Sequence, residues 1–245
     1  MRAEPAGRQL GSACDGDLSG IYTEIAAYYS AKVKRFGATP LGVDWTCQAT
    51  QEMRFVQLLK LCDFTSAFSL NDLGCGYGAL IAYLDRRHPR CPIDYLGIDV
   101  SAAMVRRARR LWRGRTMVAF TRGYATSRTA DYAVASGIFN VAQNQSISQW
   151  ERFVKASLDH LYQTSRRGFA VNFMKKPAGT SGRQGLYYGD AALWARYCAG
   201  RFGAATEVYE DYGMREFTLL VRRLENRRDH CPTDSRSRVS SSSRL

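Results

Sequence analysis

Two acids and a cluster of glycines are the residues of this sequence whose types and spacing are best suited to chemistry. Residues 70–78 read Leu-Asn-Asp-Leu-Gly-Cys-Gly-Tyr-Gly, an apolar run that passes Asp72 and leads into glycine at alternate positions. Glycine is needed where the main chain turns sharply or approaches a ligand closely, because a Cβ would obstruct either. Asp99 ends a second apolar run, and a carboxylate there suits the hydroxyls of a ribose. Together these residues predict a nucleoside site.

The elements that must position this site alternate between strand and helix. Apolar periodicity predicts helices at residues 18–33 and 48–63, before a first strand at 68–73. The alternation with short links that follows favours a doubly wound parallel sheet with helices on both faces. The further strands are predicted at 93–99, 116–121, 130–136 and 168–174, and the further helices at 78–88, 102–112, 147–163 and 190–200.

The last two predicted strands, residues 205–209 and 216–221, differ from the rest in their connection. The link between them is short and contains Gly213. Parallel neighbours need a much longer crossover, so this pair is expected to form a hairpin. The predicted fold class is therefore α/β, a doubly wound seven-stranded, mostly parallel sheet with an antiparallel last strand.

Composition limits the classes of protein and of site. Apolar residues make up 45% of the 245 residues, with no run near the ~18 apolar residues of a membrane span and no apolar segment near the N-terminus typical of a secretory signal. We therefore expect a cytoplasmic protein with no membrane partner. The seven cysteines form no C-x-x-C pair, and three histidines add little, so no metal site is expected.

The net charge of +13 raises the question of a nucleic-acid partner. Six arginines crowd the predicted helix at 102–112 and the residues after it, and others crowd the C-terminal end. Val105, Ala108 and Leu111 supply an apolar stripe on that helix, which leaves most of its arginines facing water. A solvated basic face is favoured over a phosphate-binding track.

The motifs at residues 71–78 and at 95–104, together with the terminal hairpin, resemble the class I S-adenosylmethionine-dependent methyltransferases. The second motif reads Tyr-Leu-Gly-Ile-Asp-Val-Ser-Ala-Ala-Met, and the resemblance covers roughly residues 50–222. It implies a Rossmann-like fold, S-adenosylmethionine as cofactor and methyl transfer as the reaction. In this family the glycine loop lies against the methionine portion of the cofactor, and the acid after the second strand binds both ribose hydroxyls.

The resemblance implies roles for individual positions of this sequence. Family members commonly carry an acid after the third strand, where this chain has Gly-Tyr-Ala, so main-chain groups of Tyr124 and Ala125 are the expected substitutes. Asn140, after the fourth strand, is expected either to contact cofactor or acceptor or only to cap a turn. The other implied cofactor contacts are Asp72, Gly74, Cys75, Gly76, Gly78, Asp99, Val100, Ser101 and Met104. Ser101 is also the preferred N-cap of the helix after it.

A dinucleotide-binding dehydrogenase is the rival interpretation. Gly74, Gly76 and Ala79 also satisfy the G-x-G-x-x-G/A fingerprint, which is a weak signal by itself. Asp72 would place a negative charge near a pyrophosphate, and the terminal hairpin is foreign to that fold. Both observations favour the methyltransferase.

The acceptor is expected to be a small molecule methylated on oxygen or nitrogen, mainly through proximity and alignment. Residues 136–140 read Ser-Gly-Ile-Phe-Asn, which departs from the Asn/Asp-Pro-Pro-aromatic motif of base-amino methyltransferases. The stretch from Tyr28 to Trp45 is similar to N-terminal regions that close over the cofactor in small-molecule methyltransferases. The alternatives are an RNA methyltransferase that uses the arginines, and a non-catalytic nucleotide-binding scaffold. No general base is identified.

The expected organisation has four parts. Residues 1–17 are a flexible N-terminus, and residues 18–66 form a helical lid. Residues 67–223 form the S-adenosylmethionine-binding methyltransferase domain. Residues 224–245, rich in serine and arginine, are expected to be a disordered tail.

Overall fold

A computed structural model of the chain describes residues 18–179 and 181–224. The expected flexible N-terminus at 1–17, and all but the first residue of the expected tail, lie outside the described residues. No helix among the described residues combines the length and the apolar character that a membrane crossing requires.

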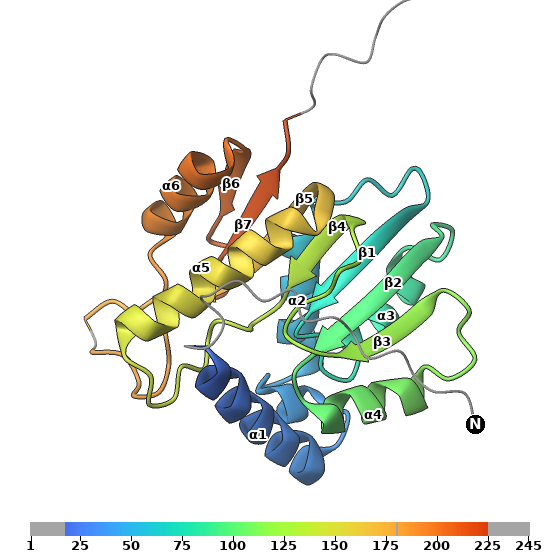
Figure 1. The fold of residues 1–245 in the computed structure, drawn as a ribbon, viewed down its shortest axis with the longest axis horizontal. Coiled ribbons are helices and arrows are strands. Elements are labelled where there is room, and N and C mark those ends of the chain that lie inside the picture. Colours follow the sequence, from blue (N-terminus) through green and yellow to red (C-terminus); the bar gives the residue numbers. More distant parts are fainter. Residues whose placement is uncertain (1–17, 180, 225–245) are drawn as a thin grey trace, which may run out of the picture.

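The centre of the molecule is one seven-stranded sheet with the strand order β3-β2-β1-β4-β5-β7-β6 (Figure 1). Strand β7 runs antiparallel to both of its neighbours, and the remaining pairs are parallel. The predicted fold class is confirmed. The strands are β1 (Phe68–Leu73), β2 (Ile93–Asp99), β3 (Val118–Arg122), β4 (Ala130–Ala135), β5 (Ser165–Met174), β6 (Ala205–Tyr209) and β7 (Glu216–Arg222).

Helices cover both faces of the sheet (Figure 1). One apolar cluster joins the sheet to α5 and α6, and a second joins the opposite face to α2, α3 and α4. The helices are α1 (Ser19–Phe36), α2 (Gln48–Leu59), α3 (Ala79–Arg87), α4 (Ala102–Leu111), α5 (Ile147–Gln163) and α6 (Ala191–Phe202), with a short 3-10 helix η2 (Pro40–Val43).

Local sequence explains where the key helices begin. The Ser101 hydroxyl accepts the Met104 N–H at 3.2 Å, which confirms Ser101 as the N-cap of α4. Ser146 and Gln149 form a capping box at the start of α5. These caps fix where α4 and α5 begin. The loops that follow β2 and β4 therefore end at defined residues near the edge of the sheet.

The two halves of the sheet wind outward from β1 and β4, which makes their carboxyl ends the topological switch point. Helix α1 lies over this edge (Figure 1), and η2 contacts α1. Helix α2 belongs to the core instead, because Phe55, Leu58 and Leu59 are buried in the second apolar cluster. We therefore restrict the proposed lid to α1 and η2, a smaller segment than the expected lid at 18–66.

Candidate functional site

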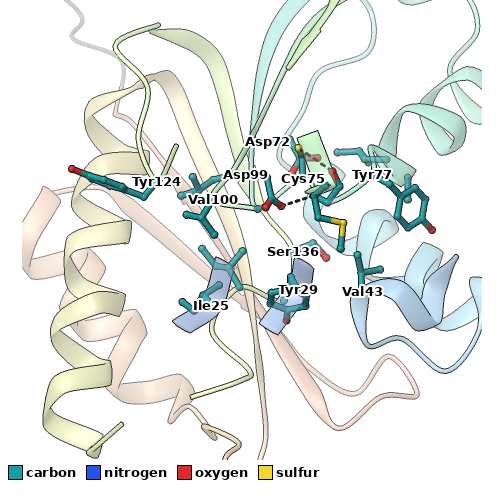
Figure 2. Close-up of a pocket in the computed structure, with 18 of the residues that line it drawn as sticks. Ile25, Tyr29, Val43, Asp72, Cys75, Tyr77, Asp99, Val100, Tyr124 and Ser136 are labelled. Atoms are coloured by element: carbon teal, nitrogen blue, oxygen red, sulfur yellow. Dashed lines mark hydrogen bonds between the residues drawn. The ribbon is translucent and has the colours of Figure 1, made fainter. Parts of the chain in front are cut away.

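A cavity lies at the switch point, between the strand ends and helix α1. Figure 2 shows Asp72, Cys75 and Asp99 on its sheet side, with Ile25 and Tyr29 of α1 facing them. The site is thus positioned by β1, β2 and β4 and is closed by a helix from the N-terminal region.

The glycine loop after β1 needs glycine for a specific reason. Gly74 has a φ of +74°, and a Cβ added to it would lie 2.2 Å from Cγ2 of Ile138. Gly76 has a φ of +56° and donates its N–H to Oδ2 of Asp99 at 2.9 Å. A side chain at Gly74 would displace the segment after β4, so this loop can approach that segment only without one.

Asp99 is held by main-chain donors at the end of β2. Its Oδ1 accepts the Ser101 N–H at 2.8 Å, and its Oδ2 accepts the Gly76 N–H. Burial raises the pKa of Asp99 to about 6, although these two donors act in the opposite direction. Each carboxylate oxygen keeps a lone pair for a further donor. The carboxylate is therefore oriented and still able to accept hydrogen bonds from a ligand.

Asp72 is the second buried acid on the cavity wall. The Tyr95 hydroxyl donates to its Oδ2 at 2.6 Å. Burial raises the pKa of Asp72 to about 7, with a smaller contribution from the charge of Asp99, while the bond from Tyr95 lowers it. A ligand that brings a positive charge to this wall would stabilise the ionised form of Asp72.

The far end of the cavity is apolar and aromatic. Val100 and Met104 line it from the β2–α4 segment, and Ile25 lines it from the lid. The Tyr124 ring stacks on Tyr22 of α1, with ring centroids 4.2 Å apart and an interplanar angle of 15°. Figure 2 shows Tyr124 and Val100 on the same side of the cavity, apart from Tyr77 and Val43. This end suits a planar base.

Comparison with known proteins identifies the chain's family. A sequence family described as a methyltransferase domain matches residues 71–164. The Mycobacterium tuberculosis protein named "Putative methyltransferase Rv1506c" is 42% identical over 166 residues, which span 67% of this chain and 99% of that protein. The chain belongs to the class I S-adenosylmethionine-dependent methyltransferases.

Solved structures agree with the methyltransferase fold at low identity. The N-methyltransferase NodS of Bradyrhizobium japonicum, in complex with S-adenosyl-L-homocysteine, superposes with a TM-score of 0.58 at 16% identity, over 82% of this chain and 99% of that one. Human N-acetylserotonin methyltransferase, in complex with S-adenosylmethionine, gives 0.56 at 16% identity over 84% of this chain. The methyltransferase described here spans 59% of the length of the human enzyme.

The first cavity, hereafter called the cofactor cavity after the ligand proposed for it, has groups that complement S-adenosylmethionine. The ligand offers an ammonium group, ribose hydroxyls and a flat base, and the cavity offers two buried acids and an aromatic end. The Ser136 hydroxyl on its wall is buried without a hydrogen-bond partner among the described residues. No cluster of His, Cys, Asp and Glu in the described part of this methyltransferase could hold a metal ion.

A second cavity of about 830 Å³ adjoins the cofactor cavity. The two share four lining residues, Tyr29, Val43, Trp45 and Gly137. Gly137 has a φ of +75°, and an added Cβ would lie 2.4 Å from Cζ2 of Trp45. The junction between the cavities therefore depends on this contact between Trp45, just after η2, and the segment after β4.

A buried network of hydrogen bonds contacts both Trp45 and Gly137 at the junction. Nε of Arg54 donates to both carboxylate oxygens of Glu216, at 2.9 and 3.0 Å, and its guanidinium lies 3.6 Å from the centroid of the Trp45 ring. Asn172 donates to Glu216 at 2.8 Å and accepts the Gly137 N–H at 2.8 Å. The network connects α2, β7, β5 and the β4 end, so it holds both Trp45 and Gly137 in place.

Asn140 lies on the wall of the second cavity. It is only 4% exposed, and both its Oδ1 and its Nδ2 lack a hydrogen-bond partner among the described residues. A buried amide without partners is costly, and such groups in a native structure call for a ligand or another compensating group. The expectation that Asn140 caps a turn is not supported, because its side chain bonds to nothing in that turn.

The structure brings most of the predicted cofactor contacts onto one wall. Gly78 instead packs beside Trp112 and begins α3, and Ser101 caps α4 and bonds to Ser30 at 2.8 Å. Ala125 and Asn140 also lie off the wall of the cofactor cavity. The predicted residues that line the cofactor cavity are Asp72, Gly74, Cys75, Gly76, Asp99, Val100, Met104 and Tyr124.

Several wall residues were absent from the predicted contacts. Tyr22, Ser136 and Phe153 line the cofactor cavity, and Tyr95 supports Asp72 from beneath. Tyr187 lies in the core instead, and its hydroxyl accepts the Trp194 indole N–H at 3.1 Å. The regular periodicity of α1 and α5 marks which residues face inward, but it does not distinguish a cavity wall from a packed core.

Proposed function

We propose that this methyltransferase transfers the methyl group to an oxygen or nitrogen of a small molecule bound in the second cavity. The observation that carries the proposal is the unpartnered amide of Asn140, buried in a cavity that opens onto the cofactor cavity at Gly137. Its amide can both donate and accept, which suits an uncharged polar group of an acceptor.

In the proposed arrangement the cofactor lies along the strand ends. Asp99 accepts hydrogen bonds from the ribose hydroxyls, and Asp72 faces the ammonium end. Val100, Met104 and Tyr124 enclose the adenine. The bound cofactor supplies the electrophilic methyl group. Residues of this chain align the acceptor with it and exclude water, because α1 covers the edge of the sheet.

Similar proteins support the small-molecule class. The NodS structure is described as an N-methyltransferase, and the human structure as an N-acetylserotonin methyltransferase. The volume of the second cavity lies within the range of small-molecule sites.

The RNA alternative rests on the arginines of α4, and some of these have structural roles. Arg109 donates to the Phe120 carbonyl at 2.8 Å, and Arg115 just beyond the helix pairs with Asp85. Arg106 and Arg110 are exposed. A steeply salt-dependent affinity for RNA, reduced in the Arg106→Gln, Arg110→Gln double variant, would favour this alternative over ours.

The experiment for the proposal measures S-adenosylhomocysteine release with a panel of small hydroxyl and amine compounds, in the wild-type protein and in Asn140→Leu. We expect turnover with at least one compound class, and loss of that turnover in Asn140→Leu with an unchanged affinity for S-adenosylhomocysteine. Turnover on RNA but on no small molecule would overturn the proposal.

A further inference from the structure

The charged residues on the wall of the second cavity fall into two groups. Lys32 forms an ion pair with Asp44, and Arg54 forms one with Glu216. Arg183 and Arg215 also line this cavity, and neither guanidinium has an acidic or hydrogen-bonding partner among the described residues. The wall therefore carries two uncompensated positive charges beside two neutralised pairs.

The two arginines come from different segments whose main chains are anchored. The Arg183 N–H donates to the Tyr188 hydroxyl at 2.9 Å, and the next turn is tied to the β4–α5 segment by the Gln143 N–H, which donates to the Gly185 carbonyl at 2.9 Å. The Arg215 carbonyl accepts the Lys175 N–H at 2.8 Å, directly before β7. Both arginines thus line one cavity from segments whose main chains are hydrogen-bonded to neighbouring parts of the protein.

Like charges gathered around a concave surface attract an anion, since the field in a cleft is focused and less screened than on a flat face. Guanidinium groups bind carboxylate and phosphate in a bidentate fashion. Exposed arginines alone are common on surfaces, but here the same wall also carries the buried, unpartnered amide of Asn140. The two arginines therefore point to a negative charge on the ligand, and the Asn140 amide points independently to a polar ligand in the same cavity.

We infer that the acceptor carries an anionic group, a carboxylate or a phosphate, which Arg183 and Arg215 bind while Asn140 holds a neutral polar group nearer the junction. This inference rests on the proposed small-molecule function. It makes Arg183 and Arg215 determinants of acceptor specificity, with no contact to the cofactor cavity.

The test uses matched aromatic probes, because Tyr28, Tyr29 and Trp45 also line the cavity. Benzoate, phenyl phosphate and the neutral benzamide are titrated by calorimetry into protein saturated with S-adenosylhomocysteine. The variants are Arg183→Gln, Arg215→Gln and the control Arg196→Gln, which removes the same charge from an exposed position on α6. The affinity of each variant for S-adenosylhomocysteine reports whether it is folded and loaded.

We expect an anionic probe to bind the wild-type protein more tightly than benzamide, with an affinity that falls as salt is added. Each of Arg183→Gln and Arg215→Gln should weaken that binding about tenfold, and Arg196→Gln should leave it unchanged. The stronger of benzoate and phenyl phosphate identifies the anion.

Two other results would contradict the inference in different ways. Equal affinity for benzamide and the anions, or unchanged binding in both cavity variants, would overturn the anionic class and leave a small-molecule acceptor in place. Binding of none of the three probes by the loaded protein would contradict the proposed acceptor cavity itself.

Discussion

The cofactor cavity and the second cavity share Gly137 and Trp45, yet they differ in how their polar groups are satisfied. Asp72 and Asp99 each have partners from neighbouring strand ends or the adjacent loop. The side chains of Asn140, Arg183 and Arg215 have none among the described residues. The difference teaches that the acids of the first wall are held by hydrogen bonds within the protein, whereas the second wall carries polar side chains that remain able to bind a ligand.

The largest effect should come from breaking the network beneath the second cavity. Glu216→Gln leaves Arg54 buried with no compensating charge, and we expect the free energy of unfolding to fall by about 3 kcal/mol or more in urea denaturation. The control Glu207→Gln breaks the exposed pair with Arg222 and should cost less than about 1 kcal/mol. Equal losses would show that the buried pair does not support the junction.

Removing the acid at the end of β2 should separate cofactor binding from helix capping. Asp99→Ala deletes charged hydrogen bonds, so we expect S-adenosylmethionine affinity in calorimetric titration to fall by about 2 kcal/mol or more. Ser101→Ala removes the α4 cap and should cost about 1 kcal/mol of stability with unchanged affinity. Unchanged affinity in a folded Asp99→Ala variant would show that Asp99 has only a structural role.

Cofactor affinity should also depend on pH. The pKa of Asp72 is about 7 and that of Asp99 about 6, both raised by burial. As pH falls through these values the carboxyls gain protons, so affinity for S-adenosylhomocysteine should be about tenfold weaker at pH 6 than at pH 8. Asp72→Asn should weaken binding at pH 8 and flatten much of this profile. A wild-type profile without slope would contradict the assignment of the ammonium end to Asp72.

The same raised pKa values make the stability of the unliganded protein fall with rising pH, whereas cofactor affinity rises. In the unfolded chain these carboxyls ionise near their ordinary value of 3.8, while the folded, unliganded protein retains their protons to about pH 6 to 7. Their contribution to stability is therefore fully present below pH 3.8 and is lost as pH rises from there to about 7. Asp72→Asn should consequently raise the melting temperature of the unliganded protein at pH 8.

The smallest expected effect is that of a substitution at Asn140. It tests most directly the difference between the two cavities. Asn140→Leu removes two unpartnered polar atoms from a buried position, so we expect the unliganded protein to be more stable by about 1 kcal/mol in thermal denaturation. Asn144→Leu, at an exposed neighbouring position, is the control and should change stability little. A destabilised Asn140→Leu would mean that the amide has partners that the static structure lacks.

Much of the fold could be predicted because its signals are local. The strands at 68–73, 93–99 and 205–209 were predicted to the residue, as was the helix at 147–163. The helix predicted over 48–63 ends at Leu59, and the strand predicted from 168 begins at Ser165, because tertiary packing and pairing with β4 decide such ends. The 3-10 helix at 40–43 was missed, since its four residues carry no periodic pattern.

The candidate site, like the fold, has a part that could be predicted from local sequence and a part that could not. The glycine loop, Asp72 and Asp99 follow from the sequence, because each lies within a few residues of the strand that positions it. The sequence alone thus determined the fold class, the cofactor and the acids expected to bind it. Only the tertiary structure decided that Asn140 faces the second cavity, that Arg54 and Glu216 meet beneath Trp45, and that Arg183 and Arg215 share one wall. Those residues lie far apart in the chain, and contacts between distant segments leave no pattern in either segment alone.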